Sequence, residues 1–144
     1  MELDTMARVF TEATLENLGD LLEVQRGLRS PDQARRITVT DALVETGATG
    51  LSLTTRLIRQ LGLTKRYDKR VTTSAGLGTA ALYEAVRLTI QGRDGTVDVM
   101  EVPDNVPVLV GQIPLEFLDF VIDTRSQRRI GNPAHGGEQI LEMY

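Results

Sequence analysis

The segment ALVETGATGLSL, residues 42–53, leads from an apolar run into a carboxylate and then into a glycine-containing loop. Threonine and glycine, which are common in turns, follow Glu45, so this side chain is either an ordinary acid at a strand end or an acid that transfers protons. The sequence has no cysteine and one histidine, which excludes thiol nucleophiles and any site built from several histidines of one chain. Carboxylates are the chemistry that remains, and we expect neither a metal nor a cofactor.

Two other motifs could carry chemistry, and both are weaker. His135 lies in the segment GNPAHGGE, which is typical of a loop, and no G-x-S-x-G elbow exposes Ser52 or Ser74 as its nucleophilic partner. The segment GLGTAA, residues 76–81, matches a dinucleotide-binding fingerprint. The preceding KRVTTS is too polar for a buried central strand, and the residues that follow alternate as a strand does. We therefore favour a solvated histidine and a glycine-tipped hairpin.

Composition limits the remaining classes of function. A chain of 144 residues with 41% apolar composition fits one domain over residues 1–144. The net charge is −4 and the basic residues are scattered, so we expect no nucleic-acid partner. No apolar run approaches the ~20 residues that span a bilayer, and the first ten residues lack the apolar core of a signal peptide. We expect no membrane partner and a cytoplasmic protein.

The elements on either side of Glu45 have clear signals. Residues 36–44 alternate as a strand, which predicts one face formed by Ile37, Val39, Asp41 and Leu43. After the loop, apolar residues recur at helical spacing. Thr54 or Thr55 is a suitable cap for this short helix, and Gly62 is suited to its C-terminal end.

The N-terminal part has weaker signals. Residues 1–22 mix apolar and acidic side chains, and TLENLGDLLEV fits either a helix or two strands about a turn at Gly19-Asp20. We favour strands. Residues 26–36 are charged and contain Ser-Pro-Asp, which is typical of an exposed loop.

The second half of the chain favours strands and one further helix. Residues 70–102 alternate with period two, and Asp94-Gly95 predicts the turn of a hairpin. Residues 106–111 are a short apolar run that ends on a glycine. Pro114 is suited to the first position of a helix over PLEFLDFVI, residues 114–122.

Taken together, three segments resemble the retropepsin-like aspartic proteases: ALVETGATGLSL, AGLGTA at residues 75–80, and VPVLVGQIPLEFL at residues 106–118. The resemblance covers residues 37–123. It implies an all-β fold, the retropepsin-like acid-protease β-barrel with one or two short helices. It also implies a homodimer that hydrolyses an extended peptide or protein substrate bound between its protomers, without a cofactor.

The resemblance assigns roles to individual residues. Glu45 takes the place of the catalytic aspartate, and Thr46 and Gly47 complete the catalytic triplet, with Thr46 bonding across the two-fold axis. A hairpin over residues 72–84, with its tip at Gly76-Leu77-Gly78, covers the site. The substrate-binding residues it implies are Ala48, Ala75, Gly76, Leu77, Gly78, Thr79, Val110 and Gly111.

Glutamate at position 45 departs from the family pattern. Two aspartates in this family share one proton, because two like charges in contact cannot both ionise easily. The extra methylene of glutamate would move each carboxyl off the hydrogen bonds of its loop, and a misplacement of ~1 Å can lower a rate on the order of a hundredfold. We expect low or absent activity, and the alternative is a non-catalytic homodimeric module for peptide binding or assembly. The resemblance also implies that EQILEMY, residues 138–144, forms a strand of the dimer interface.

Overall fold

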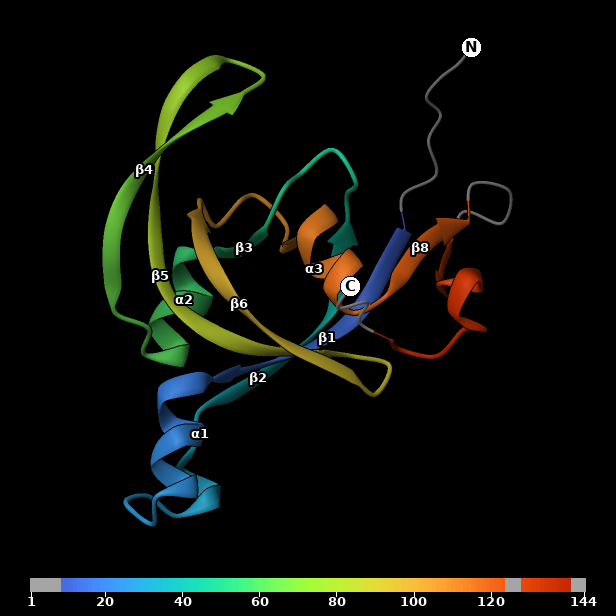
Figure 1. Ribbon diagram of the computed structural model, residues 1–144. Coiled ribbons are helices and arrows are strands. Elements are labelled where there is room, and N and C mark those ends of the chain that lie inside the picture. Colours follow the sequence, from blue (N-terminus) through green and yellow to red (C-terminus); the bar gives the residue numbers. More distant parts are fainter. Residues whose placement is uncertain (1–8, 124–127, 141–144) are drawn as a thin grey trace.

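The computed structural model describes residues 9–123 and 128–140 (Figure 1). Its elements in chain order are β1 (Val9–Asn17), α1 (Leu18–Gln25), η1 (Pro31–Gln33), β2 (Arg36–Val44), β3 (Leu51–Thr54), α2 (Thr55–Leu61), β4 (Lys65–Thr73), β5 (Gly76–Ile90), β6 (Arg93–Val102), β7 (Leu109–Val110), α3 (Gln112–Phe117), β8 (Phe120–Asp123), β9 (Arg128–Gly131) and η2 (Pro133–His135). The predicted all-β class is confirmed.

Seven strands form one sheet in the order β1-β2-β7-β3-β6-β5-β4, and β8 pairs with β9 in a separate ribbon. An additional antiparallel pairing joins β1 to β5, so the sheet closes on itself and β4 remains outside the ring. Closure removes the free edges of a sheet, which otherwise attract other strands. The β4–β5 hairpin continues past the ring and rises on the same side of the molecule as the loop between β2 and β3 (Figure 1).

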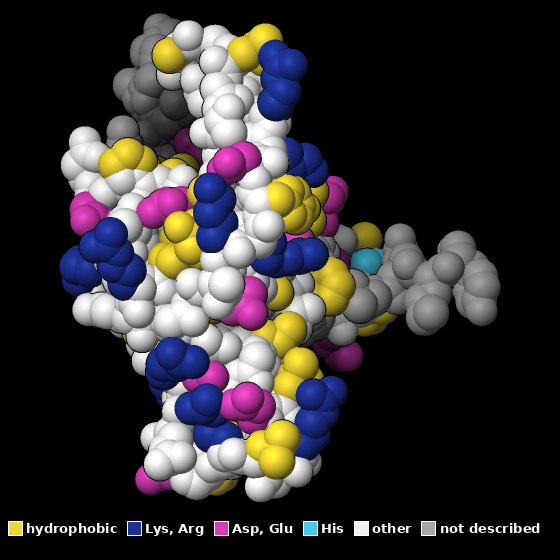
Figure 2. Space-filling view, turned by 90° about the vertical axis from the view of Figure 1, so that its left-hand side faces the viewer, with side chains coloured by type: hydrophobic (Ala, Val, Ile, Leu, Met, Phe, Trp, Pro, Cys, Tyr) yellow, Lys and Arg dark blue, Asp and Glu magenta, His cyan; other side chains and the backbone are white. Residues whose placement is uncertain are grey.

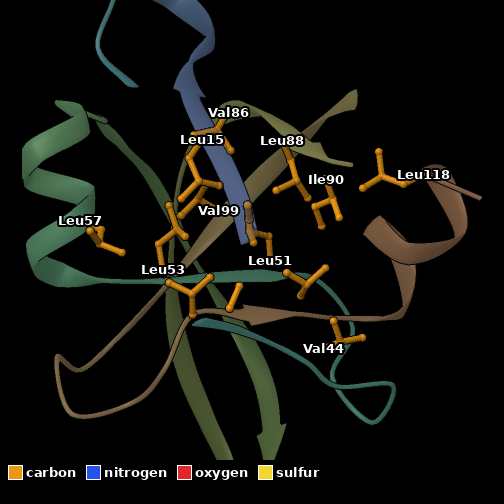
Figure 3. Close-up of a cluster of buried hydrophobic side chains, with 14 of the residues drawn as sticks. Leu15, Val44, Leu51, Leu53, Leu57, Val86, Leu88, Ile90, Val99 and Leu118 are labelled. Atoms are coloured by element: carbon orange, nitrogen blue, oxygen red, sulfur yellow. The ribbon is translucent and has the colours of Figure 1, made fainter. Parts of the chain in front are cut away.

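The core fills the inside of the ring. Branched side chains from β1, β2, β3, β5, β6 and β7 meet there, and α2 and α3 cover its ends with leucines and an isoleucine (Figure 3). The largest side chains with almost no exposed surface are Leu15, Leu51, Leu53, Leu61, Leu88, Ile90, Leu115 and Leu118. This burial holds in place the strand ends on which the site is built.

The simple alternation predicted for residues 36–44 is wrong. Thr11 pairs with Ala42 but Ala13 pairs with Val39, so β2 contains one extra residue at this point, a β-bulge. The bulge exchanges the two faces of the strand. Val39 before it and Ala42 after it therefore both face the core, and Asp41 lies exposed in the bulge.

Of the two strands predicted about Gly19-Asp20, the first is confirmed as β1 and the second is wrong, because Leu18–Gln25 forms helix α1. The Asn17 side chain caps the helix by accepting a hydrogen bond from the Asp20 N–H at 3.0 Å, and it donates one to the Leu61 carbonyl at 2.7 Å. Asp20 is buried and receives two hydrogen bonds from the Arg35 guanidinium, at 2.8 and 2.9 Å. Capping and a tertiary ion pair thus fix a helix that local sequence leaves ambiguous.

The predicted caps of helix α2 are confirmed: Thr54 is the N-cap, and Gly62 adopts the left-handed conformation at the C-terminal end. The predicted helix over residues 114–122 is too long, because α3 ends at Phe117 and the chain enters β8 after Asp119, whose φ is 62°. Pro114 lies in its first turn, where a missing N–H costs no hydrogen bond.

Both hairpin turns differ from their predicted positions. The β5–β6 turn is Gln91-Gly92, with φ values of 49° and 77°, and Asp94 and Gly95 are already paired within the strands. The β4–β5 turn is Ser74-Ala75, because Thr73 pairs with Gly76. Gly76 and the residues after it therefore begin β5.

Residues 138–140 follow η2 without regular structure, and residues 141–144 of the expected interface strand lie outside the described residues. That strand stays a prediction for the dimer. No helix in residues 9–123 and 128–140 is long and apolar enough to cross a bilayer.

Candidate active site

The loop at residues 45–50 joins β2 to β3, which lie on either side of β7 in the sheet. The chain therefore crosses the end of β7, where the Glu45 N–H donates to the Val110 carbonyl at 3.0 Å. The Gln112 N–H donates to the Ala48 carbonyl at 2.8 Å, and the Ile113 N–H donates to the Thr49 carbonyl at 2.9 Å. These bonds tie both halves of the loop to the junction between β7 and α3.

Gly111 is the residue on which the loop closes. Its N–H donates to the Gly50 carbonyl at 2.9 Å. A Cβ at this position would lie 2.6 Å from the Gly50 oxygen and 2.7 Å from the Ala48 oxygen, both of them backbone atoms. Only glycine allows the loop to approach this closely.

Glu45 extends from this loop with its side chain exposed. One carboxylate oxygen, Oε1, accepts a hydrogen bond from the Gly47 N–H at 3.0 Å, and the Glu45 carbonyl accepts one from the Ala48 N–H at 3.1 Å. This bond belongs to a single chain, so the expectation that the extra methylene moves the two carboxyls of a symmetric pair off their loops stays a prediction. The glutamate keeps one oxygen on the backbone and leaves the other open to solvent.

Thr46 and Gly47 are exposed beside Glu45. In the described part of the chain, no hydrogen bond joins the Glu45 carboxylate to a second acid. Asp41 lies four residues earlier along β2, roughly 13 Å away at ordinary strand rise. Within the described residues, the loop at 45–50 thus presents one carboxylate, that of Glu45.

A row of side chains crosses the sheet next to this loop, on the face that points away from the core. Strand pairing places Leu109 beside both Leu43 and Ser52, and it places Met100 beside Ser52. The next pair along the row joins Met100 to Leu82. None of these five residues was predicted from the sequence as part of an apolar row, although Leu43 was assigned to a strand face and Ser52 was considered as a nucleophile. The sequence feature that could have identified them is alternation, because each of them is next to a core residue in its strand and therefore faces the other side of the sheet.

The row forms an apolar floor beside the loop. Leu43 and Leu82 are buried without belonging to the core cluster, and Leu109 is half-buried. The Met100 methyl lies 3.6 Å from the point where a Cβ on Gly50 would stand, so the floor reaches the loop. Val110, which the resemblance implied as a substrate contact, faces the core and has no exposed surface.

The expected covering residues lie on the β4–β5 hairpin. Thr73 Oγ1 holds the turn, since it accepts from the Ala75 N–H and donates to the Gly76 carbonyl, both at 3.1 Å. Gly76 has a φ of 109°, and Leu77 is 72% exposed. Gly78 and Thr79 follow in β5. Among the described residues, no hydrogen bond joins this tip to the loop at 45–50.

His135 is not the solvated histidine that the sequence predicted. Its Nδ1 lies 2.6 Å from Oδ2 of the buried Asp119, and Asn132 donates to the other oxygen at 2.9 Å. Burial alone would raise the pKa of Asp119, but the hydrogen bonds from His135, Asn132 and the Ile140 N–H outweigh it and lower this pKa. This cluster fastens the segment after β9 to the end of α3.

Comparison with known proteins identifies the same region. Residues 36–114 match a family model described as aspartyl protease. The match begins with β2 and ends in α3, so it includes the loop at 45–50, the β4–β5 hairpin and the β7–α3 junction. No curated protein matches the chain.

Proposed function

The chain belongs to the aspartyl protease family, and on that premise we propose that two copies of it form a peptide-hydrolysing site about a two-fold axis. The observation that carries the proposal is the exposed Glu45 carboxylate, held by the Gly47 N–H on a loop that backbone bonds fix to the β7–α3 junction. The mechanism needs two such carboxylates and one chain supplies one, so a second copy completes the site.

The chemistry follows from two carboxyls that share one proton. One Glu45 is ionised and takes a proton from a water molecule, whose oxygen attacks the carbonyl carbon of the peptide bond. The other Glu45 is protonated and donates a hydrogen bond to the carbonyl oxygen, which stabilises the charge that develops there. As the carbon–nitrogen bond breaks, the leaving amine takes the proton that the first Glu45 removed from the water, and the two carboxyls again share one proton.

The substrate is an extended peptide. The half-buried row that includes Leu109 and Met100 supplies an apolar floor, and the β4–β5 hairpin covers the chain from above. Thr46 of each copy bonds across the axis and holds the two loops together. Glutamate lowers turnover relative to aspartate because its free oxygen lies farther from the loop.

A second candidate is a non-catalytic homodimeric module that binds peptides or serves in assembly. Glutamate at position 45 is the observation that favours it, since the catalytic geometry of a carboxylate pair is narrow. Exchange of this side chain separates the two candidates.

Digestion of a proteome-derived peptide library tests the proposal, with cleavage products identified by mass spectrometry. We expect slow cleavage by the unchanged protein, an increase in kcat/KM of about 10- to 100-fold for Glu45→Asp, and a decrease of about 100-fold or more for Glu45→Gln. Asp41→Asn, which removes an exposed carboxylate from the same strand, is the matched control and should leave cleavage unchanged. If neither the unchanged protein nor Glu45→Asp cleaves any peptide, the binding module is the better account.

A further inference from the structure

One face of the β4–β5 hairpin continues the face of the sheet that carries the apolar floor of the site. Leu82, which belongs to the floor, pairs with Tyr67 of β4, and the pairing continues without interruption to Thr73 and Gly76. Paired residues share a face and successive residues alternate. The β4 side chains on the floor side are therefore Tyr67, Lys69, Val71 and Thr73.

Lys69 is the one charged side chain of that set. It is exposed, and its cross-strand neighbour is Ala80, whose side chain is a single methyl group. Asp68 and Arg70 precede and follow it on the strand, so their side chains lie on the opposite face of the hairpin.

Two of the other three cations of β4, Lys65 and Arg66, form ion pairs, whereas among the described residues none joins Arg70 to an acid. Lys65 Nζ lies 2.9 Å from Asp68, and Arg66 Nη1 lies 3.4 Å from Asp98. Basic and acidic side chains are accordingly intermixed over the side of the molecule that carries β4 (Figure 2). Within the described residues no ion pair joins Lys69 to an acid, although the chain as a whole has a net charge of −4.

We infer that Lys69 makes the proposed peptidase select substrates with an acidic side chain beneath the hairpin. The inference rests on the proposed function, and it names the class of peptide that the site takes. The two Glu45 carboxyls carry negative charge at the centre of the site, so the acidic residue binds away from the cleaved bond. Each copy contributes one Lys69, and acidic residues are therefore enriched on both sides of that bond.

The test compares three proteins on the same peptide library: the unchanged chain, Lys69→Glu and Arg70→Glu. Both substitutions reverse an exposed charge on one strand, but only Lys69 is on the floor side, so Arg70→Glu is the matched control. We expect acidic residues to be enriched about threefold at one position on each side of the cleaved bond. Lys69→Glu should replace this preference with one for basic residues, and Arg70→Glu should retain it.

The same three proteins are also compared with Glu45→Asp added to each, because this substitution is expected to make cleavage faster. Cleavage without an acidic preference, or a preference that Lys69→Glu leaves in place, would overturn the inference and leave the proposed function standing. An equal effect of both substitutions would also overturn it, because the whole hairpin and not Lys69 would then set the preference. Absence of cleavage in both backgrounds would remove the proposed function and this inference with it.

Discussion

Glu45 is one methylene longer than aspartate, and the loop accommodates part of that length. Its Oε1 stays on the Gly47 N–H at 3.0 Å, so one end of the carboxylate remains fixed to the backbone. A Cβ on Gly47 would lie 3.2 Å from this oxygen, which is tighter than an ordinary contact. Glycine at position 47 therefore leaves room for the longer side chain to fold back onto its own loop.

Asp20 is a buried charge that stabilises the fold away from the site. It is 3% exposed, and the hydrogen bond from the Arg35 side chain is the main reason that its pKa falls from 3.8 to about 2. A carboxyl with a lowered pKa stabilises the folded state above its unfolded pKa and loses this contribution as the pH falls through its folded value. The contribution of Asp20 is thus complete above about pH 4 and declines toward pH 2.

We predict that Asp20→Asn lowers the free energy of unfolding by about 2 kcal/mol at pH 7, as expected for loss of a hydrogen-bonded charge. Because Asp20 becomes protonated at low pH, the difference between the two proteins should shrink between pH 4 and pH 2. Urea unfolding curves at these pH values measure it, with Asp41→Asn as the exposed control. A difference that stays constant down to pH 2 would show that ionisation of Asp20 does not stabilise the fold.

At the scale of elements, the sequence predicted those helices and strands whose formation depends on neighbouring residues in the chain. The alternation over β2 identified the strand before the loop at residues 45–50, and the Thr54 and Gly62 signals identified α2, which follows β3. The bulge in β2 could not be found in this way, since only the pairing of Thr11 and Ala13 with the strand reveals it. Helix α1 likewise depends on Arg35, which lies beyond the helix in the sequence.

A glycine that is needed for packing was mistaken for a turn residue. Asp94-Gly95 has the composition of a hairpin turn, but a Cβ on Gly95 would overlap the Phe117 ring, so this glycine makes room for α3. The actual turn at Gln91-Gly92 carries a weaker signal, because glutamine rarely adopts a positive φ. The candidate site also combines local and long-range information. The sequence alone led to the proposal of Glu45, Thr46 and Gly47, but the floor residues are brought together by strand pairing.

The backbone hydrogen bonds that hold the loop at residues 45–50 to the β7–α3 junction lead to a second prediction. Gly111 has φ and ψ of −89° and −171°, which alanine also adopts, so Gly111→Ala acts only through the collision with the Gly50 and Ala48 carbonyls. We expect it to lower the free energy of unfolding by about 1–3 kcal/mol. It should also abolish cleavage by shifting the loop.

Gly78→Ala is the control for this prediction, since no atom lies within 4 Å of a Cβ placed there. Urea unfolding of both variants measures the effect. Equal stability of the two variants would indicate that the loop moves aside freely and that the close approach of Gly111 to the loop does not position Glu45.

At the scale of the whole molecule, the closed sheet presents the loop, the floor and the hairpin on one side. Ile113 lies beside the loop, with its N–H on the Thr49 carbonyl, and it is 55% exposed. Phe117 lies one turn farther along α3 and is 42% exposed. Exposed apolar side chains beside this loop suit a surface that a second copy covers in the proposed dimer. Burial of these two side chains would favour formation of the proposed dimer.

The central claim is that peptide hydrolysis requires one Glu45 from each of two chains. Subunit mixing tests it most directly: the unchanged chain and Glu45→Gln are unfolded together in different ratios, refolded, and assayed for cleavage at constant total protein. If both carboxylates are required, the rate falls with the square of the unchanged fraction, to about one quarter in an equal mixture. A rate that falls in proportion, to about one half, would mean that each chain acts alone and would contradict the shared site.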